Sequence, residues 1–300
     1  MALLTQGAGL AGKRAIVVGG GDGVGRAVTL ALAAEGVDIA VCDWKEDALA
    51  ATVRDASAMG RRVFSSVVDV LDVQQTDNFF ASVDREFENV QILVNVPGGA
   101  KRRAFTSSTR ALMERDIRLN YGYALDAILH TIPMIRRGGQ GGSIISFTTI
   151  EADRGAPGFS VYAGAKAGLR NFSRSLAAEL ALERIRVNVI APDATPSETN
   201  SNALGEKALG QLAQLPLESV QALTKMQVPM GEAPPAEALA NGVVFLASDL
   251  SEYITGISLP IDAGTSGAMG FVNWPFGDGM LPVPLHGTLS RLFAHDKPTW

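Results

Sequence analysis

The chain has 300 residues, 47% of them hydrophobic and 19% charged, a composition typical of a globular protein with a sizeable buried core. Its formal net charge of -5 provides no basic excess to attract nucleic acid or anionic lipid, and its single cysteine, Cys42, excludes an intramolecular disulfide and a multi-cysteine metal site. No apolar run approaches the roughly 18 residues of a membrane span, and Met1 to Gly12 do not resemble a secretory signal, so we expect a cytoplasmic protein.

Short apolar runs alternate with segments of helical spacing along most of the chain. The strand-length runs are Ala15 to Val18, Val37 to Val41, Val63 to Val68, Ile92 to Val94, Ser143 to Phe147, Arg186 to Ile190 and Ser258 to Ile261. The helical segments are Val24 to Glu35, Lys45 to Ala58, Val73 to Glu88, Ser108 to Arg136, Ser160 to Glu183 and Pro235 to Ala247. This alternation predicts one α/β domain, a doubly wound, mainly parallel seven-stranded Rossmann sheet with helices on both faces.

Two segments interrupt the alternation. We expect residues 12–264 to form the core, residues 193–231 to form a substrate lid, and residues 265–300 to form a C-terminal tail. The tail is rich in aromatic residues and is expected to pack against the body or a neighbouring subunit. One apolar face of a lid helix is suggested by Leu204, Ala208, Leu212 and Leu215, although Gly205 and Gly210 weaken that helix.

A glycine-rich turn joins the first strand to the first helix. Its candidate contacts to a dinucleotide are Gly19, Asp22, Gly23, Val24 and Gly25. Glycine has no Cβ to hold a pyrophosphate away from the backbone, and the start of a helix attracts anions. The spacing is not the strict G-x-G-x-x-G pattern, so a purely structural tight turn is the alternative interpretation.

Asp43 follows the next strand, 18 residues after Gly25, where an acid is expected to receive the adenosine ribose hydroxyls. A carboxylate at this place would repel the 2′-phosphate of NADP, so NAD is the favoured cofactor. The alternative is that Asp43 only caps the helix that begins near Lys45.

Tyr162 and Lys166 are four residues apart in a helical segment and therefore lie on the same face. A free tyrosine titrates near pH 10, but a fixed ammonium beside it stabilises the phenolate and lowers its pKa. The spacing thus indicates an acid–base pair.

These features together resemble the short-chain dehydrogenase/reductase family over nearly the whole chain, from about Gly12 to Gly264. The further positions that match the family's motifs are Asp69 and Val70 after the third strand, Asn95 and Gly98 after the fourth, Asn120 in a helix, and Pro192 after the sixth strand. The sequences Phe245-Leu246-Ala247-Ser248-Asp249, Thr255-Gly256 and Asp262-Ala263-Gly264 resemble its C-terminal signature.

The resemblance implies an NAD(H)-dependent enzyme that interconverts an alcohol and a ketone by direct hydride transfer. Tyr162 would exchange the proton on the substrate oxygen, Lys166 would also hold the nicotinamide ribose, and Asn120 would anchor a water in a proton relay. It implies cofactor contacts for Asp69, Val70, Asn95, Gly98 and Pro192, a small-molecule substrate, and a homo-oligomer, either a dimer or a tetramer.

Five positions depart from the family pattern. Thr149 stands where a serine, 13 residues before the tyrosine, normally orients the substrate oxygen. Val18 replaces the threonine that begins the glycine motif, and Val96 and Pro97 replace an asparagine and an alanine in the segment after the fourth strand. Because Val18 and Val96 are both apolar, a polar contact between the two segments is replaced from both sides. Asp193 replaces a glycine and places a charge near the nicotinamide, where it either favours the cationic oxidised ring or points to solvent.

Two other functions remain open on this sequence. One is a noncatalytic nucleotide-binding regulator or scaffold, since a fold alone does not determine function. The other is an NADP-dependent ketoacyl reductase, which Asp43 and the acidic net charge disfavour. A basic run, Lys101-Arg102-Arg103, follows the fourth strand and is either a solvated loop or a contact for an anionic substrate. The three histidines are too dispersed to indicate a metal site.

Overall fold

A seven-stranded parallel sheet lies at the centre of the protein. The structure is a computed structural model and describes residues 8–193, 195, 210, 214, 216–273 and 279–282. The strands are β1 (Arg14–Val18), β2 (Asp38–Asp43), β3 (Val63–Val67), β4 (Ile92–Asn95), β5 (Gly142–Phe147), β6 (Ile185–Pro192) and β7 (Ser258–Ile261). They pair in the order β3-β2-β1-β4-β5-β6-β7, and every pairing is parallel. The predicted doubly wound sheet is confirmed.

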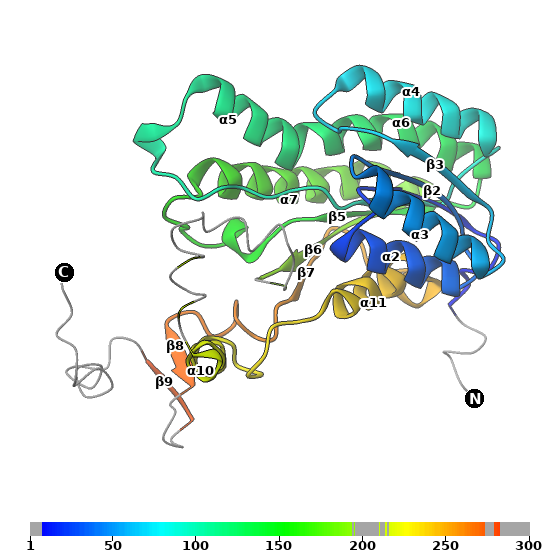
Figure 1. Ribbon diagram of the computed structural model, residues 1–300. Helices are drawn as coiled ribbons and strands as arrows, with labels where there is room; N and C mark the ends of the chain where they lie inside the picture. The colour runs from blue at the N-terminus through cyan, green and yellow to red at the C-terminus, as the bar shows by residue number, and fades with distance from the viewer. Residues whose placement is uncertain are drawn as a thin grey trace, which may run out of the picture.

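Helices cover both faces of this sheet (Figure 1). The helices are α2 (Gly23–Ala34), α3 (Glu46–Ala58), α4 (Val73–Glu86), α5 (Arg110–Ile117), α6 (Tyr123–Gly138), α7 (Ser160–Leu180), α10 (Leu217–Gln227) and α11 (Ala236–Ala247). Buried residues of α4, α6 and α7 belong to one core cluster, and those of α2, α3 and α11 belong to a second. Each face of the sheet therefore has its own core.

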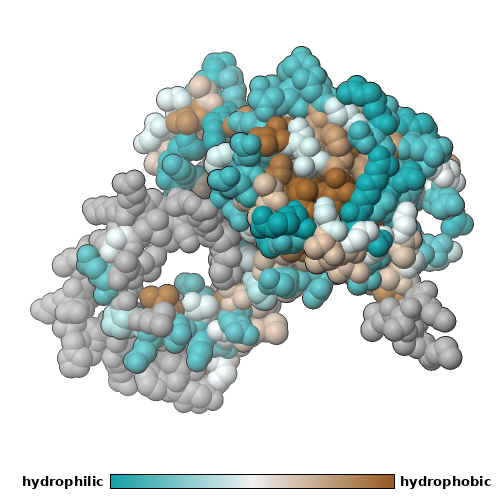
Figure 2. All heavy atoms as spheres, turned by 45° about the vertical axis from the view of Figure 1, so that its right-hand side comes forward, coloured by the Kyte–Doolittle hydropathy of each residue, from teal (hydrophilic) through white to brown (hydrophobic). Residues whose placement is uncertain are grey.

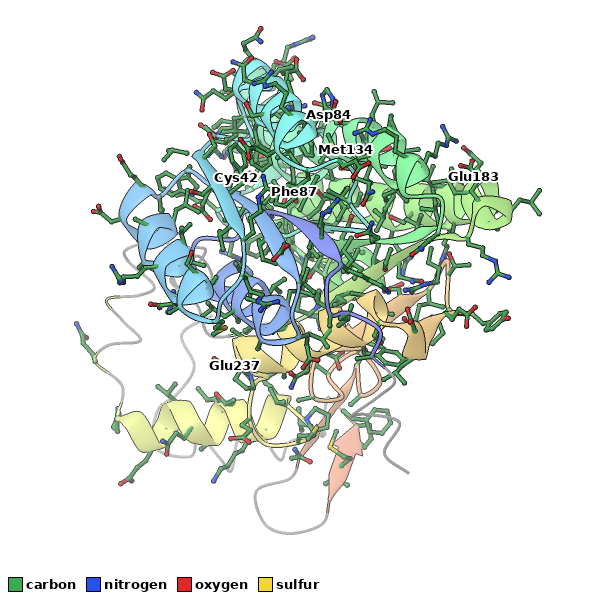
Figure 3. The ribbon with its side chains drawn as sticks, turned by 90° about the vertical axis from the view of Figure 1, so that its right-hand side faces the viewer. Cys42, Asp84, Phe87, Met134, Glu183 and Glu237 are labelled. Carbon is green, nitrogen blue, oxygen red and sulfur yellow. The ribbon has the colours of Figure 1, made fainter. Side chains whose placement is uncertain are left out.

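Alternating side chains of the central strand β1 explain this division. Ile16 and Val18 belong to the first cluster, whereas Ala15 and Val17 belong to the second, as the two-residue period of a strand requires. Cys42 is buried in the first cluster and lies inside the molecule in Figure 3. Burying such side chains stabilises the fold by roughly 1.5–3 kcal/mol for each large aliphatic residue.

The helical segment predicted from Ser108 to Arg136 is present as a continuous helical run from Arg110 to Gly138, but one wider turn interrupts it. Two helices, α5 and α6, are joined there by a π-helical turn, η2 (Arg118–Gly122). Asn120 lies in this turn, and its side-chain Nδ2 donates to the backbone oxygen of Asp116, four residues earlier, over 2.9 Å. A side chain that takes a helix carbonyl competes with the regular backbone hydrogen bonds, which accounts for the wider turn.

The end of the 193–231 segment packs against the start of the C-terminal tail. The Nδ2 of Asn273 donates to the backbone oxygens of Lys225 and Val228, over 2.8 and 3.0 Å. The tail forms a short antiparallel pair, β8 (Phe271–Asn273) with β9 (Met280–Pro282), which the sequence analysis did not predict because three-residue strands show no alternation. Outside the described residues lie the predicted lid-helix positions Leu204, Ala208, Leu212 and Leu215, and the tail aromatics Trp274, Phe276, Phe293 and Trp300.

Most of the surface seen in Figure 2 is hydrophilic, with hydrophobic atoms gathered in one area at its upper right. No helix among the described residues is both long and apolar enough to cross a membrane. The same residues contain no group of three or more histidine, cysteine, aspartate or glutamate side chains that could hold a metal ion.

Candidate active site

The predicted site residues meet at the carboxyl ends of the strands. The sheet order reverses between β1 and β4, and ligands of doubly wound sheets bind in the crevice at such a point. The glycine turn follows β1, Asn95 ends β4, Thr149 follows β5, and Pro192 ends β6. Tyr162 and Lys166 reach the same edge from the first turns of α7.

The glycine turn passes very close to neighbouring backbone. A Cβ on Gly25 would lie 1.8 Å from the backbone oxygen of Gly19, and a Cβ on Gly19 would lie 2.6 Å from Cγ of Pro97. Gly19 also has a φ of 73°, which favours glycine. Asp22 caps α2, since its Oδ1 accepts from the backbone N–H of Gly23 over 2.7 Å. The turn thus brings exposed backbone to the start of α2, where a pyrophosphate would be held.

Asp43 connects the glycine turn to the β2–α3 loop. Its Oδ2 accepts from the backbone N–H of Gly21 over 2.9 Å, and its Oδ1 accepts from that of Lys45 over 3.0 Å. The N-cap of α3 is Lys45, with no side-chain capping bond, so Asp43 does not cap that helix. The carboxylate, which is 7% exposed, lies beside the glycine turn, as a ribose-binding acid must.

Asp69 and Val70 lie just beyond β3, beside this region. The Oδ1 of Asp69 accepts from the backbone N–H of Leu71 over 2.9 Å, and Val70 is buried. The backbone N–H of Val68 donates to the backbone oxygen of Asp43 over 2.9 Å, which joins the end of β3 to the end of β2. This arrangement is compatible with the predicted cofactor contacts of Asp69 and Val70.

Asn95 is fully buried at the end of β4 and is only partly satisfied. Its Nδ2 donates to the hydroxyl of Ser146 over 3.2 Å, while its Oδ1 has no hydrogen-bond partner among the described residues. Val18 is the neighbour of Asn95 across the β1–β4 pairing. The valine at position 18 therefore leaves a buried acceptor without the donor that a threonine would supply.

We expect Val18→Thr to stabilise the protein. The threonine hydroxyl would donate to Oδ1 of Asn95, and one such hydrogen bond is worth about 1 kcal/mol of unfolding free energy. Val17→Thr is the matched control, because Val17 points to the opposite core, and an unpaired buried hydroxyl there should cost about 1–3 kcal/mol. Urea unfolding measures both changes, and equal destabilisation by the two variants would contradict the assignment.

Gly98 lets the segment after β4 pass between two predicted catalytic side chains. A Cβ at this position would lie 2.6 Å from Nζ of Lys166 and 3.0 Å from Oδ1 of Asn120. Asn120 holds the same segment, since its Oδ1 accepts from the backbone N–H of Gly99 and its Nδ2 donates to the Gly99 oxygen, each over 2.9 Å. The π-helical turn thus aims Asn120 at the site, which fits the frequent occurrence of such turns at functional positions.

Lys166 is 2% exposed and directs its ammonium at backbone oxygens. Its Nζ donates to the oxygen of Phe147 over 2.8 Å and to that of Pro97 over 3.3 Å. Burial lowers the pKa of Lys166 to about 7.

The pKa of Tyr162 is raised, whereas the spacing to Lys166 predicted that it would be lowered. Burial raises it to about 12, the hydrogen bond with Thr149 lowers it, and the carboxylates of Glu151 and Asp193 raise it further. Lys166 is not among the groups that shift the pKa of Tyr162, and its Nζ instead donates to the backbone oxygens of Phe147 and Pro97.

The buried lysine makes the stability of the chain depend on pH. The folded pKa of about 7 lies below the ordinary value of 10.5, so between these pH values the unfolded chain binds the extra proton. Stability from this group therefore rises with pH across that range, by up to about 1.4 kcal/mol per pH unit. In Lys166→Met this contribution is absent. The quantity to measure in thermal scans is the melting temperature of the variant minus that of wild type. We expect this difference to be highest near pH 6 and to fall towards pH 10. A difference that does not change with pH would contradict the burial of a titrating lysine.

Thr149 belongs to a polar network that the sequence analysis missed. Its hydroxyl donates to the carboxylate of Glu151 in a short hydrogen bond, and Arg154 donates to the other carboxylate oxygen over 2.7 Å. Arg154 also lies 3.8 Å from Oδ1 of Asp193, whose side chain is only 19% exposed. Asp193 therefore lies beside this network, and its negative charge also raises the pKa of Tyr162. The Glu-x-x-Arg spacing after Thr149 was the available sequence signal.

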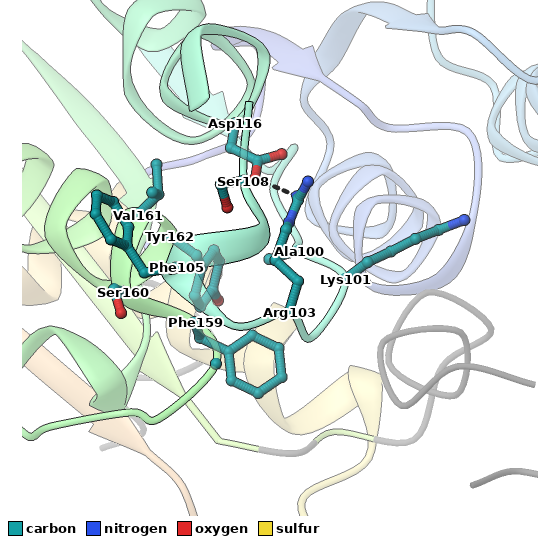
Figure 4. A pocket seen from close by; sticks show the side chains of 11 residues that line it. Ala100, Lys101, Arg103, Phe105, Ser108, Asp116, Phe159, Ser160, Val161 and Tyr162 are labelled. Atoms are coloured by element: carbon teal, nitrogen blue, oxygen red, sulfur yellow. Dashed lines mark hydrogen bonds and ion pairs between the residues drawn. The ribbon is translucent and has the colours of Figure 1, made fainter. Parts of the chain in front are cut away.

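A small, open pocket lies beside Tyr162 (Figure 4). Phe105, Phe159 and Val161 give it apolar walls, and Ser108 and Ser160 add hydroxyls. Arg103 lies on one side and is paired with the buried Asp116 at 2.5 Å, whereas Lys101 extends away from the other lining residues. The lining of the pocket therefore combines apolar and polar groups.

Comparisons with known proteins agree with this geometry. The family model described as enoyl-(acyl carrier protein) reductase matches residues 19–266. An L-rhamnose 1-dehydrogenase (NAD(P)(+)) of a Sphingomonas species is 31% identical over 256 residues, which cover 85% of this chain and 96% of that protein. A 3-oxoacyl-[acyl-carrier-protein] reductase of Chlamydia trachomatis is 32% identical over 266 residues, which cover 85% of this chain and 98% of that protein.

Solved structures show the same similarity. The carveol dehydrogenase of Mycobacterium avium in complex with NAD superposes with a TM-score of 0.78 at 28% identity, covering 87% of this chain and 99% of that one. Levodione reductase gives a TM-score of 0.78 at 26% identity, covering 86% of this chain and 99% of that one.

Proposed function

The chain belongs to the short-chain dehydrogenase/reductase family, and on this premise we propose that it is an NAD(H)-dependent oxidoreductase interconverting a secondary alcohol and a ketone. The observation that carries the proposal is the convergence of Asn120, Thr149, Tyr162 and Lys166 at the carboxyl edge of the sheet, where Tyr162 lines a pocket. A nicotinamide coenzyme bound at the glycine turn would supply or take up the hydride.

In this proposal each side chain has one task. Tyr162 gives a proton to the substrate oxygen during reduction and takes it back during oxidation. Thr149 contacts that oxygen, and Lys166 contacts the coenzyme ribose. Asn120 holds the segment Gly98–Gly99 in place. The walls of Phe105 and Phe159 help to exclude water from the reacting atoms.

NAD rather than NADP is supported by carboxylates at the glycine turn. Asp43 lies beside Gly21, and Asp22 lies at the start of α2 with its Oδ2 accepting from Nζ of Lys45 over 2.8 Å. A 2′-phosphate would meet at least one of these negative charges. The dimer or tetramer implied by the family is part of the same proposal.

A second candidate substrate class is a 3-oxoacyl thioester, because one relative is a 3-oxoacyl-[acyl-carrier-protein] reductase. It would be handled by the same residues, so only substrate tests separate it from simple alcohols. A noncatalytic nucleotide-binding role would not require Tyr162, Thr149 and the pocket to meet.

The experiment that tests the proposal is a panel of alcohols and ketones followed by nicotinamide absorbance at 340 nm. The panel contains cyclohexanol with cyclohexanone, cyclic diols, sugars, hydroxy acids and a 3-oxoacyl thioester, each with NAD(H) and NADP(H). We expect turnover of at least one pair with a preference for NAD(H). Tight NADH binding without turnover of any pair would favour the noncatalytic role.

A further inference from the structure

Glu151 is placed in direct contact with the proposed catalytic hydroxyl. Its Oε2 accepts the Thr149 hydroxyl, and its backbone N–H points back at Thr149 Oγ1 over 3.4 Å. The carboxylate is held from the other side by Arg154, and its side chain is only 19% exposed. Two contacts therefore fix Glu151 against Thr149, which is itself 4% exposed.

The direction of the bond between these groups follows from their chemistry. An ionised carboxylate only accepts hydrogen bonds, so the hydroxyl of Thr149 must donate its one proton to Glu151. What Thr149 offers to a bound substrate is then a lone pair. Tyr162 lies close enough to Thr149 for this hydroxyl to affect its pKa, so the Thr149 oxygen borders the place where the substrate oxygen would react.

This polarity distinguishes an alcohol from a ketone. While Tyr162 is protonated, a bound alcohol can accept from Tyr162 and donate to Thr149, and its proton passes to Tyr162 only after the phenol has ionised. A ketone oxygen can only accept and finds Tyr162 as its hydroxyl donor. A buried acceptor that faces another acceptor loses a hydrogen bond that water would have supplied. Bound alcohol is therefore favoured over bound ketone.

We propose that Glu151 is a positioning residue of the active site, which holds the Thr149 hydroxyl as an acceptor and thereby biases the site towards binding the alcohol. This inference rests on the proposed function. It assigns Glu151 no contact with substrate, because it acts through Thr149.

The charge of Glu151 has a second effect, on Tyr162. Charged groups near Tyr162 come from several elements: Lys166 on α7, Glu151 and Arg154 after β5, Asp193 after β6, Lys101 and Arg103 after β4, and Asp116 on α5. Glu151 and Asp193 both raise the pKa of Tyr162. Neutralising Glu151 should lower the pH at which the phenol ionises, by roughly half to one pH unit.

The test compares wild type with Glu151→Gln in the presence of NAD⁺, using cyclohexanol and cyclohexanone or the best pair from the panel. The quantity measured is the inhibition constant of the ketone divided by the Michaelis constant of the alcohol, which reports how strongly the site prefers the alcohol. We expect Glu151→Gln to lower this ratio about fivefold to tenfold, because the Thr149 proton becomes available to the ketone. The pH at which alcohol oxidation reaches half its maximum should fall as well. Glu151→Ala should lower both the ratio and the half-maximal pH. It replaces Glu151→Gln in the test if the glutamine variant does not fold.

Two controls make the test specific. Glu183→Gln removes the same charge from a glutamate that pairs with Arg136, away from the site at the edge of the molecule (Figure 3), and should leave both quantities unchanged. In a Thr149→Val background, Glu151→Gln should no longer alter the ratio but should still shift the pH profile.

Three results would overturn the inference: an unchanged ratio in Glu151→Gln, an equal change in Glu183→Gln, or a change that persists without the Thr149 hydroxyl. Failure of wild type to turn over any pair would instead refute the proposed function, on which the inference rests. The two failures are thus distinguishable.

Discussion

Tyr162→Phe is expected to lower kcat/KM about 10³-fold in both directions while NADH still binds with near wild-type affinity. Phenylalanine keeps the ring beside Phe159 but removes the hydroxyl that exchanges a proton with the substrate oxygen in the proposed reaction. Because the ring is retained, packing and the coenzyme contacts should change little. Initial rates at 340 nm give kcat/KM, and a fluorescence titration gives the affinity for NADH.

The matched control is Tyr253→Phe. Tyr253 is 88% exposed, and it lines a separate cavity at the opposite, amino-terminal edge of the sheet. This variant should keep wild-type rates. Near-normal turnover by Tyr162→Phe would remove Tyr162 from the proton transfer and leave the proposed mechanism without its acid and base.

Asp43→Ser is expected to raise the preference for NADPH over NADH, as a ratio of kcat/KM values, about 100-fold, equivalent to about 2.7 kcal/mol. The change has two causes: the carboxylate no longer repels a 2′-phosphate, and it no longer receives the ribose hydroxyls of NADH, a charged hydrogen bond worth about 1.5–3 kcal/mol. Gly21 and Lys45 also lose the acceptor of their backbone N–H groups, so the variant should be less stable than wild type.

Asp47→Asn controls for the loss of charge alone. Asp47 lies in the first turn of α3, close to Asp43 in sequence, and is exposed. Kinetics with both coenzymes should show an unchanged preference in this variant. If Asp43→Ser leaves the preference within twofold of wild type, its carboxylate is only a structural link between the glycine turn and the β2–α3 loop.

The five central strands were predictable from the sequence because nearly all of their residues are buried. The apolar run predicted at Ser258 to Ile261 is β7 itself, and the other six runs lie within two residues of strands in the structure. Strands covered by helices on both faces have nearly continuous apolar sequences, whereas the edge strands β3 and β7 are only partly buried.

The elements that escaped prediction depend on single side-chain contacts. Nothing in the helical spacing around Asn120 reveals that its amide takes the Asp116 carbonyl and opens a π-helical turn. The pair of β8 and β9 is too short to show a period, and it is supported by Asn273, whose contacts with residues 225 and 228 span more than 40 positions of the chain.

The candidate site shows the same limit. The spacing of Tyr162 and Lys166 indicated their shared face, but not that both are desolvated, which reverses the expected pKa of the tyrosine. The Thr149 hydroxyl was identified, whereas its acceptor Glu151 was not, because the charge of a glutamate two residues along a turn ordinarily points to solvent. Arg154 and Asp193 keep it against the site instead.

The central claim is direct hydride transfer at this site, and isotope transfer tests it most directly. Wild-type protein is incubated with NAD⁺ and an active secondary alcohol that carries deuterium on the carbon bearing the hydroxyl, and the coenzyme is analysed by mass spectrometry. We expect one deuterium in each NADH formed, and almost no NADH with Tyr162→Phe in the same time. NADH that forms without the label, or equal labelling with Tyr162→Phe, would contradict the account.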